Sequence, residues 1–281
     1  MSAGTARPVA VLGAGTLGRR IALMFSSRGG VVRIFDTSAS QRAAAAEWIA
    51  KRQPRLLESI TDGSAGSVEH SDDLAAVVAD AWLVVESLPE NLDIKRPIFA
   101  RLDQLAPADA ILATNSSSYP SSQLADSITT PHRLLNLHFF MPPGIRACEI
   151  MSCGQTDPAV LDRLAAAVPA YGLDPFVAKK ESLGFIYNRI WAAIKREALA
   201  VAAEGVATPE EVDRLFSSVL GTAAGPFRMM DQVGLDVVLD IEEHYAAERD
   251  GIPTGPRELL RQYIDRGELG RKSKRGFYDD Y

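Results

Sequence analysis

Short apolar runs of strand length recur along the first two thirds of the chain, separated by segments with helical spacing and by turns rich in Gly and Pro. The runs that we predict as strands cover residues 9–12, 31–35, 81–87, 110–115, 132–140, 146–152 and 174–180. Helices are predicted directly after the first run, over 37–59 with a break near Pro54, over 75–80 after a capping segment at 70–74, and over 90–105. Residues 61–67 are predicted as a loop. Strands that alternate with helices are typical of a mostly parallel sheet covered on both faces.

The pattern changes near Glu181, beyond which the apolar spacing is helical throughout. The predicted helices cover residues 184–203, 209–220, 227–249 and 258–265. We therefore expect an α/β fold with a Rossmann-type doubly wound sheet in residues 1–180, followed by an all-α domain in residues 181–281. A length of 281 residues is ordinary for two domains.

The first predicted strand leads into a glycine pattern that indicates a dinucleotide. In glycine-rich turns that bind dinucleotides, the first glycine allows the tight turn, the second lets the backbone approach the pyrophosphate, and the third lets helix and sheet pack closely. The acid at the end of the second strand would bind the adenosine ribose and repel a 2′-phosphate, and no arginine directly follows it. NAD is therefore the expected cofactor. The residues expected at it are Gly13, Gly15, Thr16, Leu17, Gly18 and Asp36.

Composition limits the class of protein and of partner. Hydrophobic residues make up 47% of the chain and charged residues 23%, as in soluble globular proteins. The net charge of −6 argues against nucleic acid or an anionic membrane surface as the main partner. No apolar run reaches the ~20 residues of a membrane helix, and the N-terminus lacks a secretion signal. We expect a cytoplasmic protein, with an organelle left open. No metal site is expected, and Cys148 and Cys153 are predicted to be buried free thiols.

Polar residues gather where the predicted strands end, which is the edge at which doubly wound sheets bind ligands. The segment 114–120 follows one strand, His138 lies late in the next, and Glu149 lies in the strand after that. A histidine beside a buried glutamate is typical of a general base with an orienting carboxylate. A satisfied core histidine is the alternative interpretation of His138 taken alone. Its place near a predicted nicotinamide favours catalysis, because removal of hydride from a carbinol requires a base for the hydroxyl proton.

Several motifs in order resemble the L-3-hydroxyacyl-CoA dehydrogenase family over nearly the whole chain. Besides the glycine pattern they are VVESLPENLDIK (84–95), NSSSY (115–119), HFFMP (138–142), ACEI (147–150), GFIYNR (184–189), GPFRMMDQVGLD (225–236) and the tail 270–281. The resemblance implies NAD-dependent interconversion of a 3-hydroxy and a 3-oxo substrate. It also implies a homodimer formed through the helical domain, where apolar stripes at 190–194, 219–220 and 229–233 exceed the needs of a small bundle.

The resemblance also implies a role for particular residues. His138 would exchange the proton of the 3-hydroxyl group, Glu149 would orient His138, and Ser117 and Asn188 would hydrogen-bond the substrate's oxygen atoms. The residues implied near the cofactor, in addition to the glycine segment, are Glu90, Lys95, Ser117 and Lys272. The residues implied at the substrate are Ser117, Met141 and Asn188. A protein that binds dinucleotide without turnover is disfavoured, because all four catalytic positions match.

Two departures from the family pattern bear on the substrate. Met141 stands where the family has an asparagine. In the family's acyl-CoA enzymes the interval that corresponds to Asp36–Glu90 is longer and holds a Lys-rich helical arm that contacts CoA, and in this sequence that arm is shortened. Related enzymes with a reduced arm, such as gulonate and carnitine dehydrogenases, act on free hydroxy acids. We therefore expect acetoacetyl-CoA to be at best a poor substrate, and a free hydroxy acid or a specialised intermediate is the alternative to a CoA thioester. The opposing interpretation is that Lys51, Arg52 and Arg55 still hold the CoA phosphates.

Overall fold

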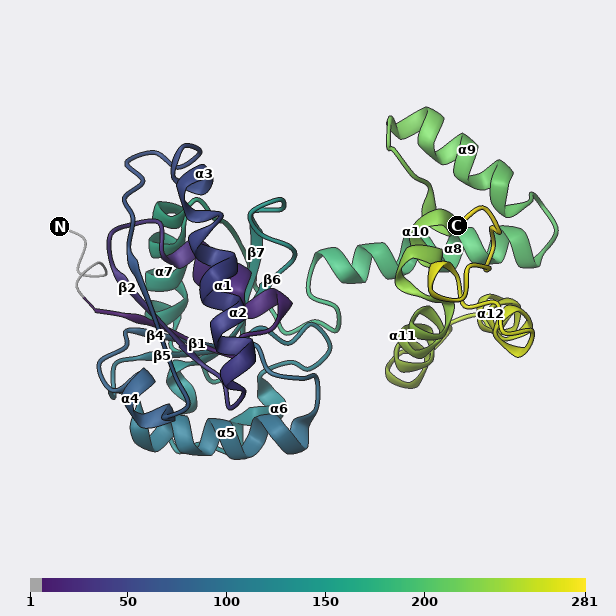
Figure 1. Ribbon diagram of the computed structural model, residues 1–281. Coiled ribbons are helices and arrows are strands. Elements are labelled where there is room, and N and C mark those ends of the chain that lie inside the picture. The colour runs from purple at the N-terminus through teal and green to yellow at the C-terminus, as the bar shows by residue number, and fades with distance from the viewer. Residues whose placement is uncertain (1–6) are drawn as a thin grey trace. The chain divides into compact units, whose positions relative to one another are not determined.

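The computed structural model describes residues 7–281, which form two compact units, one that ends at residue 185 and one over residues 186–281 (Figure 1). Residues 1–6, part of the segment expected to lack a secretion signal, lie outside the described residues. The first unit ends after Phe185 rather than after residue 180, because Phe185 packs on Met151 and Ala178 of the sheet. Within residues 7–281, no helix combines the length and the apolar character needed to cross a membrane.

The first unit is built on one eight-stranded sheet with the strand order β3-β2-β1-β4-β5-β6-β7-β8. The strands are β1 (Val9–Leu12), β2 (Val31–Phe35), β3 (Ser67–Ser71), β4 (Leu83–Glu86), β5 (Ile111–Thr114), β6 (Leu134–Phe139), β7 (Ala147–Ser152) and β8 (Asp174–Ala178). Strands β1 to β6 are parallel, β7 is antiparallel to β6, and β8 is parallel to β7. The predicted Rossmann-type, mostly parallel sheet is confirmed.

Strand β3 was not predicted: it overlaps the end of the predicted loop (61–67) and the start of the predicted capping segment (70–74). It lies at the edge of the sheet, and its residues SVEHS show no apolar run because none of them is fully buried. Backbone pairing with β2 forms the strand, as in the pair Val32 and Val68. The following helix begins at Leu74, within one residue of the predicted start, and Asp73 of the predicted capping segment accepts hydrogen bonds from the amides of Ala75 and Ala76.

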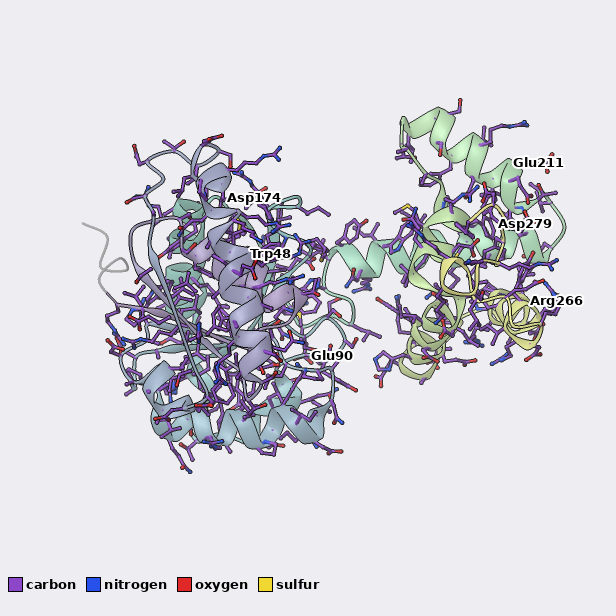
Figure 2. All side chains as sticks on the ribbon, viewed as in Figure 1. Trp48, Glu90, Asp174, Glu211, Arg266 and Asp279 are labelled. Carbon is purple, nitrogen blue, oxygen red and sulfur yellow. The ribbon has the colours of Figure 1, made fainter. Side chains whose placement is uncertain are left out.

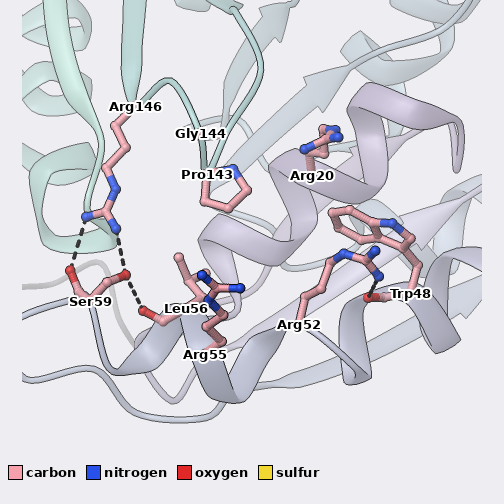
Figure 3. Close-up of a pocket in the computed structure, with 9 residues that line it drawn as sticks. All are labelled: Arg20, Trp48, Arg52, Arg55, Leu56, Ser59, Pro143, Gly144 and Arg146. Atoms are coloured by element: carbon pink, nitrogen blue, oxygen red, sulfur yellow. Dashed lines mark hydrogen bonds between the residues drawn. The ribbon is translucent and has the colours of Figure 1, made fainter.

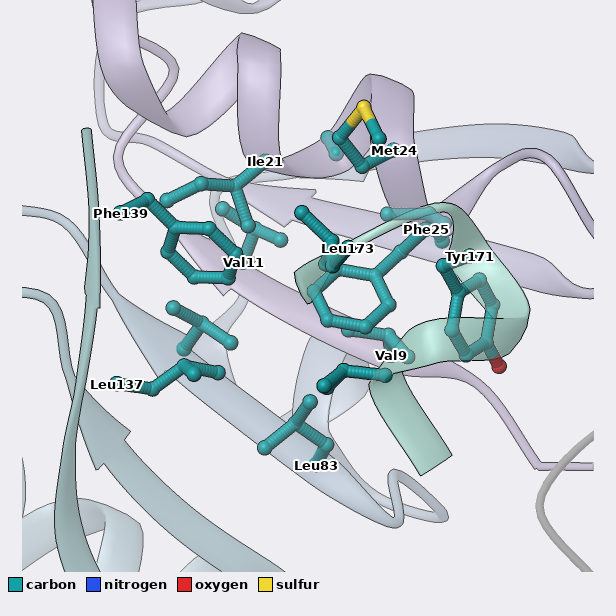
Figure 4. Packing of buried hydrophobic residues seen from close by; sticks show 14 of the residues in the cluster. Val9, Val11, Ile21, Met24, Phe25, Leu83, Leu137, Phe139, Tyr171 and Leu173 are labelled. Carbon is teal, nitrogen blue, oxygen red and sulfur yellow. The ribbon is translucent and has the colours of Figure 1, made fainter. Parts of the chain in front are cut away.

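Helices cover both faces of the sheet (Figure 1). They are α1 (Thr16–Phe25), α2 (Ala39–Ala50), α3 (Gln53–Leu57), α4 (Leu74–Val78), α5 (Leu92–Leu105), α6 (Ser122–Ala125) and α7 (Pro158–Ala167). The core between α1, α7 and the sheet holds aromatic pairs, in which the Phe25 ring packs on Phe139 and Tyr171 with centroids 6.3 and 4.8 Å apart (Figure 4). Helix α7 was not predicted, since residues 153–173 were left unassigned.

The second unit is all helical, as predicted. Its helices are α8 (Tyr187–Ala203), α9 (Pro209–Leu220), α10 (Pro226–Val233), α11 (Leu235–Glu248) and α12 (Gly255–Asp265). The single helix predicted over 227–249 is wrong, because Gly234 adopts φ +109° and separates α10 from α11. Thr208 and Glu211 form a capping box at the start of α9. Glu211 is labelled in Figure 2. Buried Asp231 accepts the amides of Phe277 and Tyr278 and so anchors the C-terminal segment.

Candidate active site

The turn between β1 and α1 fits a dinucleotide pyrophosphate. Gly13 has φ +99°, and a Cβ on Gly18 would lie 1.9 Å from the Gly13 carbonyl oxygen, so both positions require glycine. A Cβ on exposed Gly15, by contrast, would meet nothing within 4 Å. In residues 7–281 the amides of Thr16 and Leu17 have no protein acceptor, and the first turn of α1 carries no acid. Open space above free helix N-terminal amides is the environment that a pyrophosphate needs.

Asp36 is held in place at the end of β2 by the backbone on both sides of the site. Its Oδ2 accepts the Ala14 amide at 2.8 Å and its Oδ1 accepts the Ser38 amide at 2.8 Å. The sequence analysis missed Arg42, whose guanidinium donates to the Asp36 carbonyl oxygen at 2.5 Å and to Asp72 Oδ2 at 3.1 Å. The carboxylate therefore has a fixed direction, and the nearby arginine is paired with an acid.

His138 and Glu149 form a buried pair at the edge of the sheet where the parallel strands end. Strands β6 and β7 are antiparallel, and their register places the two residues directly opposite each other. His138 Nδ1 lies 3.1 Å from Glu149 Oε2, and the two residues are 5% and 2% exposed. A carboxylate at Nδ1 favours the tautomer with the proton on that nitrogen, which leaves Nε2 as the acceptor. The expected acid–base pair therefore has the geometry that its chemistry needs.

The serine loop after β5 is organised by Glu90. Glu90 Oε1 accepts Ser116 Oγ at 2.5 Å and the amides of Ser117 and Ser118 at 3.1 and 2.9 Å. Burial alone would raise the pKa of Glu90, but these hydrogen bonds and the charge of Lys95 outweigh it and lower the pKa. Ser117 remains exposed, and its hydroxyl has no protein partner within residues 7–281. The loop is thus fixed through its backbone, while the Ser117 side chain is free to bind a ligand.

Lys95 lies beneath this loop rather than on the surface. Its side chain is 1% exposed, and its ammonium group contacts Glu86 Oε1 at 2.7 Å, Glu90 Oε2 at 3.2 Å and the Leu88 carbonyl oxygen at 3.3 Å. Glu86, which the sequence analysis missed, is wholly buried and also accepts Thr114 Oγ1 at 2.6 Å. Lys95 therefore supports the loop through Glu90. Direct contact between Lys95 and the cofactor stays a prediction.

Two further polar side chains join the ends of β5 and β6: Asn115, which belongs to the predicted polar segment 114–120, and Asn136, which the sequence analysis missed. Asn115 Oδ1 accepts the amide of Phe139, and Asn136 Oδ1 accepts the amide of Ser121, at 2.9 and 2.6 Å. Asn136 Nδ2 also donates to the Tyr119 carbonyl oxygen at 3.1 Å. The only signal in the sequence is a polar residue inside or directly after an apolar strand. Such residues need partners when buried, so they fix the loop relative to His138.

A basic pocket of about 520 Å³ lies between α1, α2, α3 and the turn that joins β6 to β7 (Figure 3). Its lining residues are Arg20, Trp48, Arg52, Arg55, Leu56, Ser59, Pro143, Gly144 and Arg146. Within residues 7–281, none of its four arginines has a carboxylate at ion-pair distance. The Arg52 guanidinium lies over the Trp48 ring, 4.3 Å from its centroid, and Arg146 donates to the Ser59 hydroxyl at 2.6 Å. Four uncompensated positive charges around one cavity favour an anionic ligand.

The remaining predicted site residues are placed as follows. Met141 lies in the turn after β6 and is 44% exposed. Asn188 lies in the first turn of α8, and Lys272 forms an ion pair with Asp236, so both belong to the second unit. Their contacts with cofactor or substrate stay predictions. Of the expected phosphate-binding residues, Arg52 and Arg55 line the basic pocket, whereas Lys51 pairs with Glu47 and does not.

Comparison with known proteins places the chain in a family. Residues 8–182 match the model of the 3-hydroxyacyl-CoA dehydrogenase NAD-binding domain, and residues 184–280 match that of the C-terminal domain of the same family. The chain belongs to the 3-hydroxyacyl-CoA dehydrogenase family. Because the match includes the NAD-binding domain, the expectation of NAD as the cofactor is confirmed.

Three similar proteins show the range of the family. A 3-hydroxybutyryl-CoA dehydrogenase of Clostridioides difficile is 30% identical to this chain. The match covers 96% of this chain and 98% of the relative. The 3-hydroxyacyl-CoA dehydrogenase-like protein LAM1 of Cochliobolus heterostrophus is 48% identical over 52% of this chain, and the match spans only 31% of LAM1. The solved structure of a diketoreductase, which acts on dicarbonyl compounds, is 31% identical with a TM-score of 0.81 and covers 98% of this chain and 99% of its own.

The fixed carboxylate of Asp36 leads to a prediction about cofactor choice. We expect the protein to bind NADH at least tenfold more tightly than NADPH, a difference of ~1.4 kcal/mol, because a 2′-phosphate would meet the Asp36 charge. Titration calorimetry with both cofactors measures this ratio. Arg42→Ala is the control and should leave the ratio unchanged, since Arg42 is paired with Asp72. Equal affinities of the unaltered protein would contradict the role given to Asp36.

Proposed function

We propose that this protein interconverts the 3-hydroxy and 3-oxo groups of an acyl thioester, with His138 as the acid–base group. The part of the substrate that carries phosphate would bind in the basic pocket. The observation that carries the proposal is the buried pair of His138 and Glu149, with His138 Nδ1 held at 3.1 Å. This pair lies near the C-terminal ends of the parallel strands, as do the glycine turn and Ser117.

Each protein group has one task in this proposal. Glu149 fixes the imidazole tautomer, so that His138 Nε2 takes the proton of the 3-hydroxyl group in oxidation and returns it in reduction. The chemistry that NAD supplies when bound is the acceptance of the hydride from the carbinol carbon. Ser117 donates to the substrate oxygen from a loop that Glu90 holds rigid, and Asn188 is the second polar group assigned to the substrate.

The basic pocket supports a substrate handle that carries phosphate. Guanidinium groups bind phosphate through paired hydrogen bonds, and a guanidinium that is itself stacked, as Arg52 is on Trp48, can also stack on a planar base. A CoA thioester has both features. The expectation that acetoacetyl-CoA is a poor substrate rested partly on the shortened arm, but Arg20 and Arg146 come from outside that arm. The pocket therefore favours the interpretation in which arginines still hold the CoA phosphates.

A second candidate is the same reaction on a free 3-oxo acid or dicarbonyl compound. Met141 favours this candidate, because it stands where the family has an asparagine and replaces that polar side chain with a flexible apolar one. The similarity to a diketoreductase supports it as well. In this case the basic pocket would bind a carboxylate rather than phosphates.

Steady-state kinetics with matched substrates test the proposal. We expect kcat/KM for acetoacetyl-CoA to exceed that for the acetoacetyl thioester of N-acetylcysteamine by at least ~10²-fold, because the shorter thioester lacks the phosphates. Longer 3-oxoacyl-CoA esters and free acetoacetate complete the panel. Turnover of a free acid that exceeds that of every thioester would favour the second candidate. No turnover of any 3-oxo compound would overturn the proposed function.

We also propose that the second unit forms a homodimer. On helix α9 the side chains of Leu215, Val219 and Leu220 are 67%, 72% and 61% exposed, whereas Met230 of a predicted stripe is wholly buried inside the unit. Light scattering at micromolar concentration should give the mass of two chains. Val219→Glu should shift the mass toward one chain, since it places a charge on this apolar surface. A monomeric mass for the unaltered protein would contradict the proposal.

A further inference from the structure

Phe185 combines an unusual backbone conformation with a contact to the active-site histidine. It is the last residue of the first unit, and it adopts φ +54° directly after Gly184 at φ +73°. A bulky residue in the left-handed region is uncommon and costs free energy, so the surrounding structure must hold it there. Phe185 is only 3% exposed, and its ring stacks on the His138 imidazole with centroids 5.2 Å apart and planes inclined by 28°.

The backbone of this turn is fixed on both sides. The Phe185 amide donates to the Ser182 carbonyl oxygen at 2.9 Å, and Ser182 Oγ donates to the Phe185 carbonyl oxygen at 3.1 Å. The Ser182 amide in turn contacts Met151 Sδ at 3.3 Å, on strand β7. The Phe185 ring packs with Met151 and Ala178. These contacts tie the strained turn to β7, the strand that carries Glu149, and to the neighbouring β8, so the ring has a defined place relative to His138 and Glu149.

We propose that Phe185 is a positioning residue for His138, an inference that rests on the proposed role of His138. The contact with Glu149 restrains the ring at Nδ1 alone, so small rotations about the His138 side-chain torsions must be limited by other contacts. Phe185 covers one face of the ring, and Phe140 meets it at 4.7 Å with planes inclined by 64°. Together these contacts fix the plane and hence the direction of Nε2, which must point at the substrate hydroxyl group.

Replacement of Phe185 by leucine tests the proposal, because it removes the stacked ring and keeps an apolar side chain. We expect F185L to lower kcat by about tenfold while KM and the NADH affinity change by less than about twofold, since the base is misaligned but binding groups remain. F185Y keeps the stacked ring and should retain at least about half of kcat. A kcat of F185L close to that of the unaltered protein would overturn the proposal.

A matched control separates positioning from loss of a buried ring. Phe227 is wholly buried and packs edge-on against Phe277 at 4.6 Å in the second unit. F227L should lower the Tm without changing kcat by more than about twofold, because Phe227 does not contact His138. A loss of kcat in F227L equal to that in F185L would show that F185L acts only through stability, and would overturn the proposal.

Nuclear magnetic resonance reports the position of the ring directly. The chain has four histidines, so the imidazole signal that disappears in H138Q identifies His138. In F185L this signal should move downfield, since nuclei above an aromatic face are shielded, and in F185Y it should stay near its original position. An unshifted signal in F185L would overturn the proposal. The turnover of H138Q tests the acid–base role of His138 separately. Normal turnover of H138Q would show that this role is wrong, whereas low turnover of H138Q with an unshifted signal in F185L would show that only the Phe185 role is wrong.

Discussion

Replacement of His138 by glutamine should lower kcat by at least ~10²-fold while the affinity for NADH stays nearly unchanged. Glutamine retains a polar side chain of similar reach but cannot take up the hydroxyl proton. The cofactor is expected to bind at other elements, namely the turn after β1 and the end of β2, and this region should remain intact. Steady-state kinetics with the best substrate of the panel and fluorescence titration of NADH measure the two quantities.

Glu149→Gln is the companion variant and should cost less than His138→Gln. The imidazole remains present, but the amide no longer fixes its tautomer as a carboxylate does. Both side chains are almost wholly buried, so thermal unfolding must show that each variant is folded. Near-normal turnover of the folded His138→Gln protein would refute the acid–base assignment. A larger loss in Glu149→Gln than in His138→Gln would show that the glutamate has a role besides orientation.

The parts of the fold that sequence predicted are those in which local pattern decides the structure. The residues from β1 to β2 carry the glycines, the apolar runs and Asp36 within one continuous segment, so the strand, turn and helix could be read directly. Strand β3 has no such pattern, because its pairing partner β2 supplies the stabilisation. Similarly, the break at Gly234 is a single-residue event inside an otherwise helical spacing.

The candidate site shows the same division. His138 and Glu149 were paired in the prediction because each lies in its own apolar strand, and the antiparallel register brings them together. The support beneath the serine loop was missed, although an acid at the end of an apolar strand, Glu86, is a signal that a buried cation must be near. The basic pocket was only half predicted. Arg52 and Arg55 are local, but Arg20 and Arg146 join them only through the tertiary fold.

The double replacement of Arg52 and Arg55 by alanine should lower kcat/KM for acetoacetyl-CoA by about 10²-fold. Each lost charge-assisted contact is worth ~1.5 kcal/mol, so two contacts correspond to roughly two orders of magnitude. Both arginines are exposed and unpaired with acids in the part of the chain that the structure describes, so the fold should tolerate the change. The loss should shrink as ionic strength rises, because salt already screens the contacts in the unaltered protein.

Two comparisons show whether the effect comes from the phosphates. The thioester of N-acetylcysteamine lacks them, so its kcat/KM should change by less than about twofold in the double variant. Lys51→Ala is the matched control, since Lys51 lies next to Arg52, is 67% exposed, and pairs with Glu47 outside the pocket. It removes a positive charge from the same surface and should leave both substrates almost unaffected. If Lys51→Ala weakened acetoacetyl-CoA as much as the double variant, the pocket would act only through general surface charge. If the double variant weakened both thioesters alike, the arginines would serve the protein structure rather than the CoA phosphates.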